Sequence, residues 1–225
     1  MWDKKNFVIE FRNIDVLQDQ NIILNAVNLQ VKANEFVLLS GTNGSGKSSL
    51  IKILTASIPF TSGEARVYDF ELKKLKPKFK AIYRRTIGLV SYDYPLIKEL
   101  TVEGNLKLIL KSYGWRVKDL VSERIREVLD LVKLNHKLLS KAEELTKAEY
   151  QKIALARAML NKPSILILDE PLSNLDDESS TSYMEILSNI YKNNSTTILF
   201  ASNNKVELEG IEGYRIVRVD KGSLI

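Results

Sequence analysis

The sequence predicts an α/β protein in which a parallel β-sheet is covered by helices. Strand-like apolar runs alternate with helical segments along most of the chain, which is typical of sheets joined by crossover helices. Two of the runs, 36–39 and 164–168, are almost entirely apolar, as expected for buried strands. The 225 residues suffice for one large domain, or one domain with a subdomain, that has a real core.

The first half of the chain is predicted to form mainly strands. We expect them at 7–11, 22–31, 36–39, 63–68 and 86–90, because these runs are apolar or alternating and end at turn residues. A glycine-rich turn follows the third run, and a helix of about 46–57 follows the turn.

The second half is predicted to be mainly helical, with two further strands. One amphipathic helix is indicated by an apolar stripe at helical spacing: Val121, Ile125, Val128, Leu129 and Val132. A second helix contains Leu155 and Met159 and ends before Pro163. Strands at 164–168 and 196–201 enclose a third helix, whose apolar residues run from 183 to 191.

Composition excludes several kinds of chemistry. The chain has no cysteine and a single histidine, His136, which rules out disulfide scaffolds, thiol nucleophiles, Cys/His zinc sites and most catalytic triads. We expect His136 at the surface of the helical region. No stretch approaches the roughly 18 apolar residues of a membrane span, and the first residues do not resemble a signal peptide. We therefore expect a soluble, cytoplasmic protein.

The net charge of +5 is concentrated in one segment, 71–85. That segment holds seven basic residues and one acidic residue, whereas the remaining 26 basic residues are balanced by 27 acidic ones. A solvated surface is the ordinary interpretation of such a lysine run. Anionic lipid at a cytoplasmic membrane surface, or an acidic partner, is the alternative. Nucleic acid is disfavoured, because no aromatic stacking platform accompanies the charge.

A phosphate-binding loop is predicted after the run at 36–39. Residues 41–48 read Gly-Thr-Asn-Gly-Ser-Gly-Lys-Ser, which fits the P-loop pattern in its strand–turn–helix context. In such a loop backbone N–H groups hold the phosphates, Lys47 reaches the β- and γ-phosphate oxygens, and the Ser48 hydroxyl binds Mg²⁺. The candidate nucleotide-binding residues here are Gly41, Thr42, Asn43, Gly44, Ser45, Gly46, Lys47, Ser48 and Ser49.

Two acidic residues close the later strand at 164–168. Asp169 is a candidate ligand in the Mg²⁺ shell together with Ser48, and Glu170 is a candidate to orient or deprotonate an attacking water. Such a pair is otherwise more often an exposed turn or a helix cap. The P-loop in the same chain favours the catalytic interpretation.

The order of these motifs resembles the nucleotide-binding subunit of ABC-type ATPases over nearly the whole chain. After the P-loop come a signature-like segment at 145–159, Ile-Leu-Ile-Leu-Asp-Glu-Pro at 165–171 and Ser-Asn-Leu-Asp at 173–176. Arg-Arg-Thr-Ile-Gly at 84–88, Leu-Thr-Val at 100–102 and Asn105 are similar in particular to the lipoprotein-release (LolD) and cell-division (FtsE) group.

This resemblance implies an α/β fold with a P-loop NTPase core and parallel sheet, an N-terminal antiparallel β subdomain and an inserted α-helical subdomain at about 92–160. All of these parts would belong to one nucleotide-binding domain of residues 1–225. The resemblance also implies ATP and Mg²⁺ as cofactors, with Asp176 among the nucleotide-binding residues. It implies a head-to-tail homodimer, or a heterodimer with another ABC ATPase subunit, in which each signature covers the nucleotide of the opposing subunit.

A separate integral membrane subunit is a further implication of the resemblance. Its candidate contacts in the helical region are Tyr94, Pro95, Leu96 and Trp115. Packing within the helical lobe is the alternative for these residues, and it is favoured for Trp115.

The signature departs from the family pattern. The family begins it with Leu-Ser-Gly-Gly, whereas here Leu145 is followed by Thr146, Lys147, Ala148 and Glu149, which we take as candidate nucleotide contacts. A lysine in a first helical turn is unfavourable unless it faces an anion, so we hypothesise that Lys147 points at the phosphate of the opposing nucleotide. Thr146 and Glu149 also form a capping-box pattern, so a simple helix start remains an alternative.

Two further family residues are replaced. The glutamine that senses the metal and the membrane partner aligns with Tyr92, and the histidine after the last core strand aligns with Asn203. Asn203 can donate a hydrogen bond to the γ-phosphate but cannot carry a positive charge. Since donors to the transition state are altered while the residues that hold Mg-ATP persist, binding should survive better than hydrolysis.

The predicted function is an ATP-binding subunit that drives or regulates a membrane partner and hydrolyses ATP through Glu170 and Asn203, slowly or only in complex. The alternative is a nucleotide-dependent scaffold, in which ATP closes a dimer with negligible turnover. A nucleic-acid-associated ABC ATPase is disfavoured, because such proteins usually carry two of these domains in one chain. We expect a peripheral position at the inner face of the cell membrane, with 71–85 as a candidate contact with anionic lipid.

Overall fold

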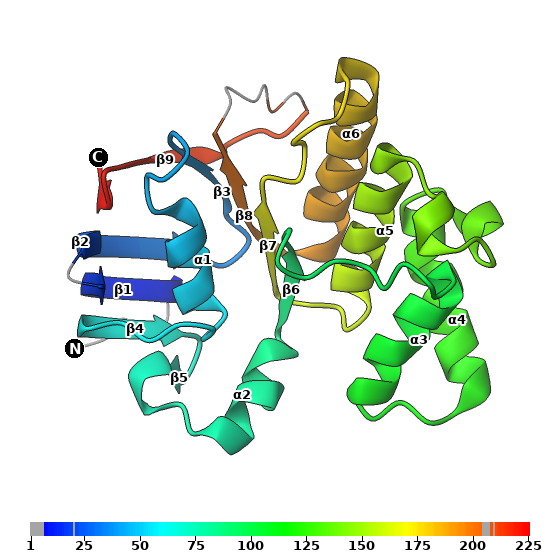
Figure 1. The fold of residues 1–225 in the computed structure, drawn as a ribbon, viewed down its shortest axis with the longest axis horizontal. Coiled ribbons are helices and arrows are strands. Elements are labelled where there is room, and N and C mark those ends of the chain that lie inside the picture. Colours follow the sequence, from blue (N-terminus) through cyan, green and yellow to red (C-terminus); the bar gives the residue numbers. More distant parts are fainter. Residues whose placement is uncertain (1–6, 20, 204–207, 209) are drawn as a thin grey trace.

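Two β-sheets form the framework of the molecule (Figure 1). The computed structural model describes residues 7–19, 21–203, 208 and 210–225. The first sheet is antiparallel with the order β2-β1-β4-β5, and its strands are β1 (Phe7–Gln18), β2 (Asn21–Lys32), β4 (Ser62–Val67) and β5 (Phe70–Glu71). The second sheet has the order β10-β9-β3-β8-β7-β6, and its strands are β3 (Phe36–Ser40), β6 (Ile87–Val90), β7 (Ile165–Asp169), β8 (Thr197–Ser202), β9 (Arg215–Asp220) and β10 (Ser223–Leu224). Neighbours in the second sheet are parallel except β9 and β10.

The central strands of the second sheet are covered on both faces. In β3, Val37 and Leu39 belong to the core shared with the antiparallel sheet, whereas Phe36 and Leu38 belong to the core shared with the helical region. The residues of β7 and β8 alternate between the two cores in the same way. Double-sided burial explains why the sequence of these strands is continuously apolar instead of alternating.

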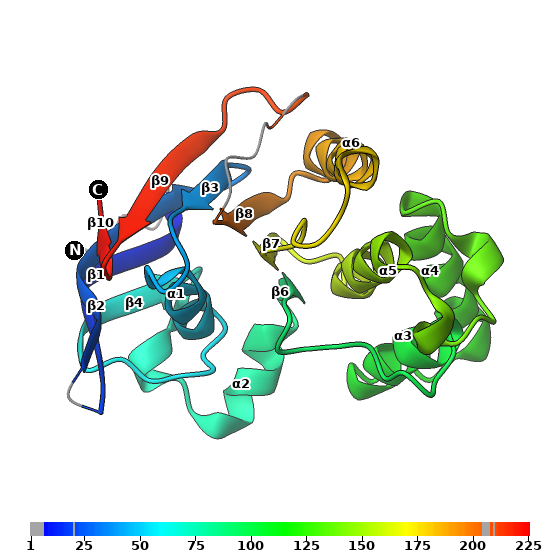
Figure 2. The same ribbon diagram turned by 45° about the horizontal axis from the view of Figure 1, so that its top comes forward.

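Helices fill the two sides of the second sheet (Figure 2). On one side α1 (Lys47–Leu54) lies between this sheet and the antiparallel sheet, and α2 (Pro77–Arg84) precedes β6. On the other side lie α5 (Lys147–Met159) and α6 (Asp177–Asn194), with α3 (Val102–Ser112) and α4 (Lys118–Leu131) beyond α5. The predicted fold class is therefore confirmed, with the helical region inserted between β6 and β7.

Some element boundaries differ from the sequence prediction. The first strand continues past residue 11 to Gln18, and it does so through register shifts around Asn13, which has a positive φ of 47°. The first helix ends at Leu54 instead of Ser57, because Ala56, directly after the C-cap Thr55, has a left-handed backbone with φ 50°. Strands β9 and β10 were not predicted. Among the described residues, no helix combines the length and the apolar character needed to cross a membrane.

Candidate nucleotide-binding and active site

The P-loop lies between the end of β3 and the start of α1, as its sequence context predicts. Gly46 precedes the helix with φ 112°, a conformation that residues with a side chain rarely adopt. At Gly41 a Cβ atom would lie 2.3 Å from the backbone oxygen of Val219, so this position has no room for a side chain. The glycines therefore serve two purposes here: one permits the turn into α1, and the other permits close contact with β9.

Lys47 is the first residue of α1 and is 5% exposed. Its Nζ donates to the backbone oxygens of Gly41 at 2.7 Å and Thr42 at 3.1 Å, so the side chain curls back over its own loop. The same Nζ lies 3.4 Å from Oε1 of Glu170. The ammonium group is thus held at the loop by three oxygen atoms, in the position where an anionic phosphate would compete for it.

Ser48 and Asp169 meet beside this lysine. The Ser48 hydroxyl donates to Oδ1 of Asp169 at 3.3 Å, which joins the start of α1 to the end of β7. Burial, together with the charges of Glu170 and Asp93, raises the pKa of Asp169, although the Ser48 hydrogen bond and Lys47 act against the shift. A carboxylate whose negative charge is destabilised in this way would be stabilised by a bound cation.

Glu170 has the left-handed conformation, with φ 51°, directly after β7. Its backbone N–H donates to the Ala201 oxygen at 3.0 Å, and its Oε2 accepts from the backbone N–H of Asn203 at 3.1 Å. The Asn203 side chain in turn donates to Oδ1 of Asn43 in the P-loop at 2.7 Å. The carboxylate is therefore held between Lys47 and the end of β8.

The residues at this site fit a magnesium nucleotide. Ser45 Oγ is buried in the P-loop and has no hydrogen-bond partner among the described residues. The hydroxyl of Ser48 and the carboxylate of Asp169 are oxygen donors of the kind that Mg²⁺ prefers, and Mg²⁺ usually takes only one or two protein carboxylates together with substrate phosphates. Consistent with this, the described residues contain no cluster of three or more His, Cys, Asp or Glu side chains that would hold a metal alone.

The signature-like segment forms a capped helix start. Thr146 is the N-cap of α5, its Oγ1 accepts from the Glu149 N–H at 3.3 Å, and the Glu149 carboxylate accepts from the Thr146 N–H at 2.9 Å. Glu149 also pairs with Lys137 at 2.9 Å. Thr146 and Glu149 are therefore engaged within this chain, whereas Lys147 is exposed and Ala148 is half-buried.

A hollow of about 590 Å³ connects the start of α5 with the acidic end of β7. Its lining includes Lys147, Tyr92, Ser173, Asp169 and Glu170. The exposed lysine therefore shares one cavity with both candidate acidic residues.

Several predicted site residues lie away from the P-loop. Tyr92 is 97% exposed and lines the hollow that also contains Asp169 and Glu170, but among the described residues its hydroxyl forms no hydrogen bond with the P-loop or with Asp169. Asp176 is exposed and caps α6, where its carboxylate accepts from the Ser179 N–H at 2.7 Å. Ser49 follows Ser48 on α1 and is half-buried. The predicted surface position of His136 agrees with its exposure.

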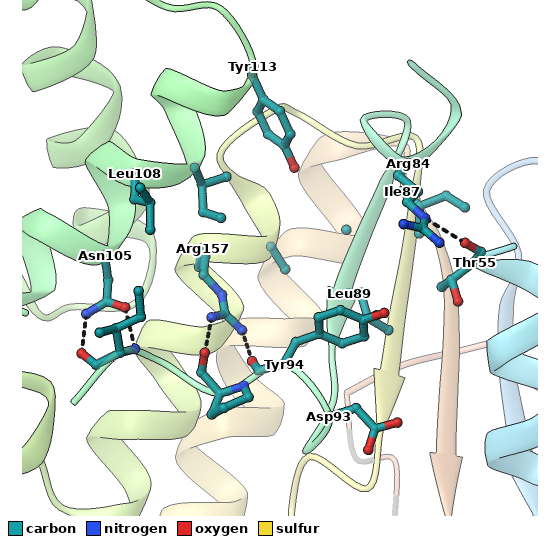
Figure 3. Close-up of a pocket in the computed structure, with 15 residues that line it drawn as sticks. Thr55, Arg84, Ile87, Leu89, Asp93, Tyr94, Asn105, Leu108, Tyr113 and Arg157 are labelled. Carbon is teal, nitrogen blue, oxygen red and sulfur yellow. Dashed lines mark hydrogen bonds between the residues drawn. The ribbon is translucent and has the colours of Figure 1, made fainter. Parts of the chain in front are cut away.

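A second cavity, of about 440 Å³, lies between α1, β6 and the helical region (Figure 3). Arg157 of α5 donates to the backbone oxygens of Tyr94 and Pro95, at 2.8 Å for Pro95, and Asn105 of α3 exchanges hydrogen bonds with the backbone of Ile97 at 2.7 and 3.0 Å. These contacts hold the segment after β6 against the helices. We call this cavity the interlobe groove, defined by Tyr94, Pro95, Leu108, Tyr113 and Arg157 in its lining.

The four candidate membrane-partner contacts divide into two kinds. Tyr94, which is 47% exposed, and Pro95 line the interlobe groove. Leu96 is 2% exposed and belongs to the core, so its prediction as a surface contact is wrong. Trp115 packs against the same core, as its alternative interpretation expected.

Sequence reasoning missed the contacts that join distant segments at the site. The bond between Asn203 and Asn43, the pair of Lys47 and Glu170, and the role of Arg157 in the groove have no local pattern. Arg157 lies in the signature-like segment at 145–159, which carries part of the family resemblance. A charged residue on the half-buried face of a helix was the one available signal.

Comparison with known proteins agrees with this geometry. The profile of the ABC transporter family matches residues 24–173. The chain is similar to the cell division ATP-binding protein FtsE of Streptococcus pneumoniae serotype 2, with 35% identity over 219 residues that cover 97% of this chain and 94% of the relative. FtsE of Bacillus subtilis is 33% identical over 202 residues, which cover 90% and 87% of the two chains. A solved dimer of the ATP-binding cassette MJ0796, in a post-hydrolysis state bound to ADP and Pi, has a TM-score of 0.85 at 26% identity and 96% coverage of both chains.

Proposed function

The chain belongs to the ABC transporter family of ATP-binding proteins, and we propose that it is the ATP-hydrolysing subunit of a membrane complex. In this proposal one nucleotide-binding domain binds Mg-ATP at the P-loop and drives or regulates a separate permease-like subunit. Lys47 and the loop backbone hold the phosphates, Ser48 and Asp169 hold Mg²⁺, and Glu170 orients or deprotonates the attacking water. The ion held by Ser48 and Asp169 would supply positive charge that stabilises the phosphates.

The position of Glu170 is the observation that carries the proposal. Its carboxylate lies 3.4 Å from the Lys47 ammonium, so the candidate base reaches the lysine of the P-loop. A protein that used ATP only to hold a dimer closed would not require an acidic residue at this place. The scaffold function therefore remains an outcome of the test below and not a second proposal.

Phosphate release from the purified protein tests the enzymatic function. Glu170→Gln should slow turnover about 100- to 10,000-fold, the usual contribution of a positioned general base. Glu178→Gln removes an exposed carboxylate from α6 and should leave the rate unchanged, which makes it a matched control. Equal rates for the wild type and Glu170→Gln, measured alone and with the membrane partner, would refute hydrolysis through Glu170.

Slow or partner-dependent turnover is part of the proposal. Asn203 is hydrogen-bonded to the Asn43 side chain and the Glu170 carboxylate. Its amide supplies no positive charge to a developing phosphate anion. Tyr92, which is 97% exposed in the hollow beside Asp169, offers a phenol in place of the amide of the family's glutamine. Both features favour a low basal rate that rises when a partner rearranges the site. Adding the partner in a reconstituted membrane should therefore increase phosphate release, and an unchanged rate would contradict this part.

A dimer is proposed as the active arrangement, with Lys147 facing the nucleotide of the opposing subunit. The exposure of Lys147 at the start of a helix supports this, because the positive helix end and the ammonium group together favour an anion. Asp176, exposed at the start of α6, is proposed to lie in the same interface. Native mass spectrometry with ATP would distinguish a homodimer from a heterodimer. Persistence of the monomer in ATP, also with the partner ATPase present, would refute the dimer.

The interlobe groove is the proposed contact with the integral membrane subunit, which places the protein at the inner face of the membrane. Leu108 lies in the groove and is 46% exposed although it is apolar. A photo-crosslinking residue in place of Leu108 should label an integral membrane protein in the native cell. The same photo-crosslinking residue in place of Leu139, which is 73% exposed outside the groove, is the matched control and should not label that membrane protein. Equal labelling from both positions would overturn the assignment.

A further inference from the structure

We propose that α2 presents a lipid-binding surface that contacts anionic phospholipid headgroups beside the membrane partner. The basic α2 surface consists of Lys73, Lys76, Lys78, Phe79 and Ile82, all exposed. The proposal rests on the proposed function in one respect: the protein acts at the surface of a membrane. It adds a direct contact with the bilayer that does not depend on any protein partner.

The lysines of this surface are free to meet an external anion. Of the five lysines between residues 71 and 85, only Lys74 forms an ion pair among the described residues, with the Glu71 carboxylate. The segment carries seven basic residues against one acidic residue, while the rest of the chain is close to electrically neutral. The positive potential is therefore local, and the carboxylates of Asp69 and Glu71, which line a hollow together with Lys76 and Phe79, offset only part of it.

The two arginines of the segment are used inside the protein. Arg84 donates to the backbone oxygens of Thr55 and Ala56, each at 3.1 Å, and Arg85 donates to the Ser112 oxygen at 3.0 Å. The planar guanidinium group of arginine is suited to bidentate recognition of one carboxylate or phosphate, whereas the ammonium group of lysine acts as a point charge. The side chains left for an external contact are thus lysines, which suit the diffuse negative field of a bilayer better than one defined acidic side chain.

Apolar side chains stand between these lysines. Phe79 is 42% exposed and Ile82 is 50% exposed, and they lie three residues apart on the helix. The ammonium group of Lys78 lies 4.9 Å from the centre of the Phe79 ring. Exposed aromatic and aliphatic side chains flanked by lysines are typical of helices that lie in the headgroup region, where the rings enter the acyl boundary and the charges meet phosphates.

The helix is held rigidly enough to present this surface. Tyr83 is fully buried, and its hydroxyl donates to the Leu54 carbonyl at the end of α1. Its ring packs edge-on against Phe70 at 5.2 Å between centroids. Together with the Arg84 contacts, these interactions anchor one side of α2 to the body of the protein and leave the Lys78 and Ile82 side exposed.

The basic α2 surface adjoins the proposed membrane-partner contact. Arg84 at the end of α2 lines the interlobe groove, and Arg85 bridges to the end of α3 on its other side. α2 and α3 lie along the same edge of the molecule in both views (Figures 1 and 2). A protein docked through the groove would therefore bring α2 toward the bilayer that contains its partner.

Sedimentation with lipid vesicles tests the proposal with the purified full-length chain. The wild type should bind vesicles that contain phosphatidylglycerol and not vesicles of phosphatidylcholine alone, and added salt should release it. Each lysine near an anionic surface contributes about a fivefold gain in affinity, so loss of three lysines weakens binding about 100-fold. The triple variant Lys73→Glu, Lys76→Glu, Lys78→Glu also adds three negative charges, so its affinity should fall by at least about 100-fold. The triple variant Lys32→Glu, Lys118→Glu, Lys192→Glu carries the same change of charge at exposed positions elsewhere and is the matched control.

The apolar contribution needs its own variant. Phe79→Ser keeps every charge and should also weaken vesicle binding several-fold, because the ring no longer enters the interface. Binding of a fluorescent ATP analogue, measured on the same samples, should be unchanged in all variants, which shows that they are folded. It also separates failure of this proposal from failure of the ATPase function.

Three results would overturn the lipid contact. They are failure of the wild type to bind either kind of vesicle, equal binding to both kinds, and equal loss of binding in the control triple variant. A fourth outcome is that soluble polyglutamate, added at a matching charge concentration, displaces the protein from vesicles while Phe79→Ser has no effect. That combination of results would overturn the lipid contact and assign the surface to an acidic protein.

Discussion

Replacing Glu170 with glutamine should change ATP affinity and ATP turnover in opposite directions. In the structure Lys47 Nζ is shared between two backbone oxygens and Oε1 of Glu170 at 3.4 Å. ATP can recruit this ammonium group only by competing with the carboxylate. A glutamine keeps the shape of the side chain and an oxygen that can accept from the Asn203 N–H, but it removes the negative charge that holds the lysine.

The size of the affinity change follows from the geometry of the pair. Two unit charges at this separation attract by about 5 kcal/mol at an effective dielectric constant of about 20. Most of this is offset by the cost of removing the charges from water, since Lys47 is 5% exposed and Glu170 is 26% exposed. Partly exposed pairs of this kind retain a net stabilisation of about 1 kcal/mol, which corresponds to about fivefold tighter ATP binding by Glu170→Gln.

Titration with a fluorescent ATP analogue in the presence of Mg²⁺ measures this change directly. Glu170→Gln should lower Kd about fivefold while phosphate release falls. The Glu178→Gln control should change neither quantity. An unchanged or higher Kd for Glu170→Gln would show that the Lys47–Glu170 pair does not restrain the lysine, and the reasoning from the 3.4 Å contact would be refuted.

Four further predictions use single variants. Asn203→His should raise phosphate release about tenfold by restoring a donor that can carry charge, and a rate at or below that of the wild type would contradict it. Gly41→Ala places a Cβ 2.3 Å from the Val219 oxygen, so urea denaturation should show a loss of about 2 kcal/mol in unfolding free energy; full stability would refute the close approach. Thr146→Ala should cost about 1 kcal/mol of stability through the lost helix cap, whereas Lys147→Ala should leave stability unchanged and weaken ATP-driven dimerisation several-fold. Unaltered dimerisation and ATP affinity in Lys147→Ala would show that this lysine does not face the opposing nucleotide.

The conformation of the P-loop could be predicted because its close backbone contacts restrict the sequence. Gly41 and Gly46 stand where a side chain would collide with β9 or Leu24, and the pattern that encodes this requirement is short and local. The strand at 36–39 was recognisable because both of its faces are buried, so every residue is apolar. In both cases the physical constraint acts on neighbouring residues and appears directly in the sequence.

The elements that were missed depend on distant neighbours. In β9, buried residues alternate with exposed ones that include Arg215 and Arg218, so the apolar signal is weak. Leu96 is apolar and lies in a connecting segment, and only the structure shows that Tyr150 Oη accepts from its N–H at 2.6 Å and holds it in the core. The Asn203–Asn43 bond joins residues that are 160 positions apart, a relation that no periodic pattern contains.

Helix α5 links two surfaces that have been described separately. Its first turn is closed by Thr146, and Arg157 near its other end holds the backbone of the segment at 94–95. The two residues are separated by about 17 Å at 1.5 Å per residue, with continuous helical hydrogen bonding between them. Because α5 is one continuous helix, a displacement of the 94–95 segment would also move the exposed Lys147 at its other end, so the interlobe groove and the proposed dimer interface are joined by a single helix.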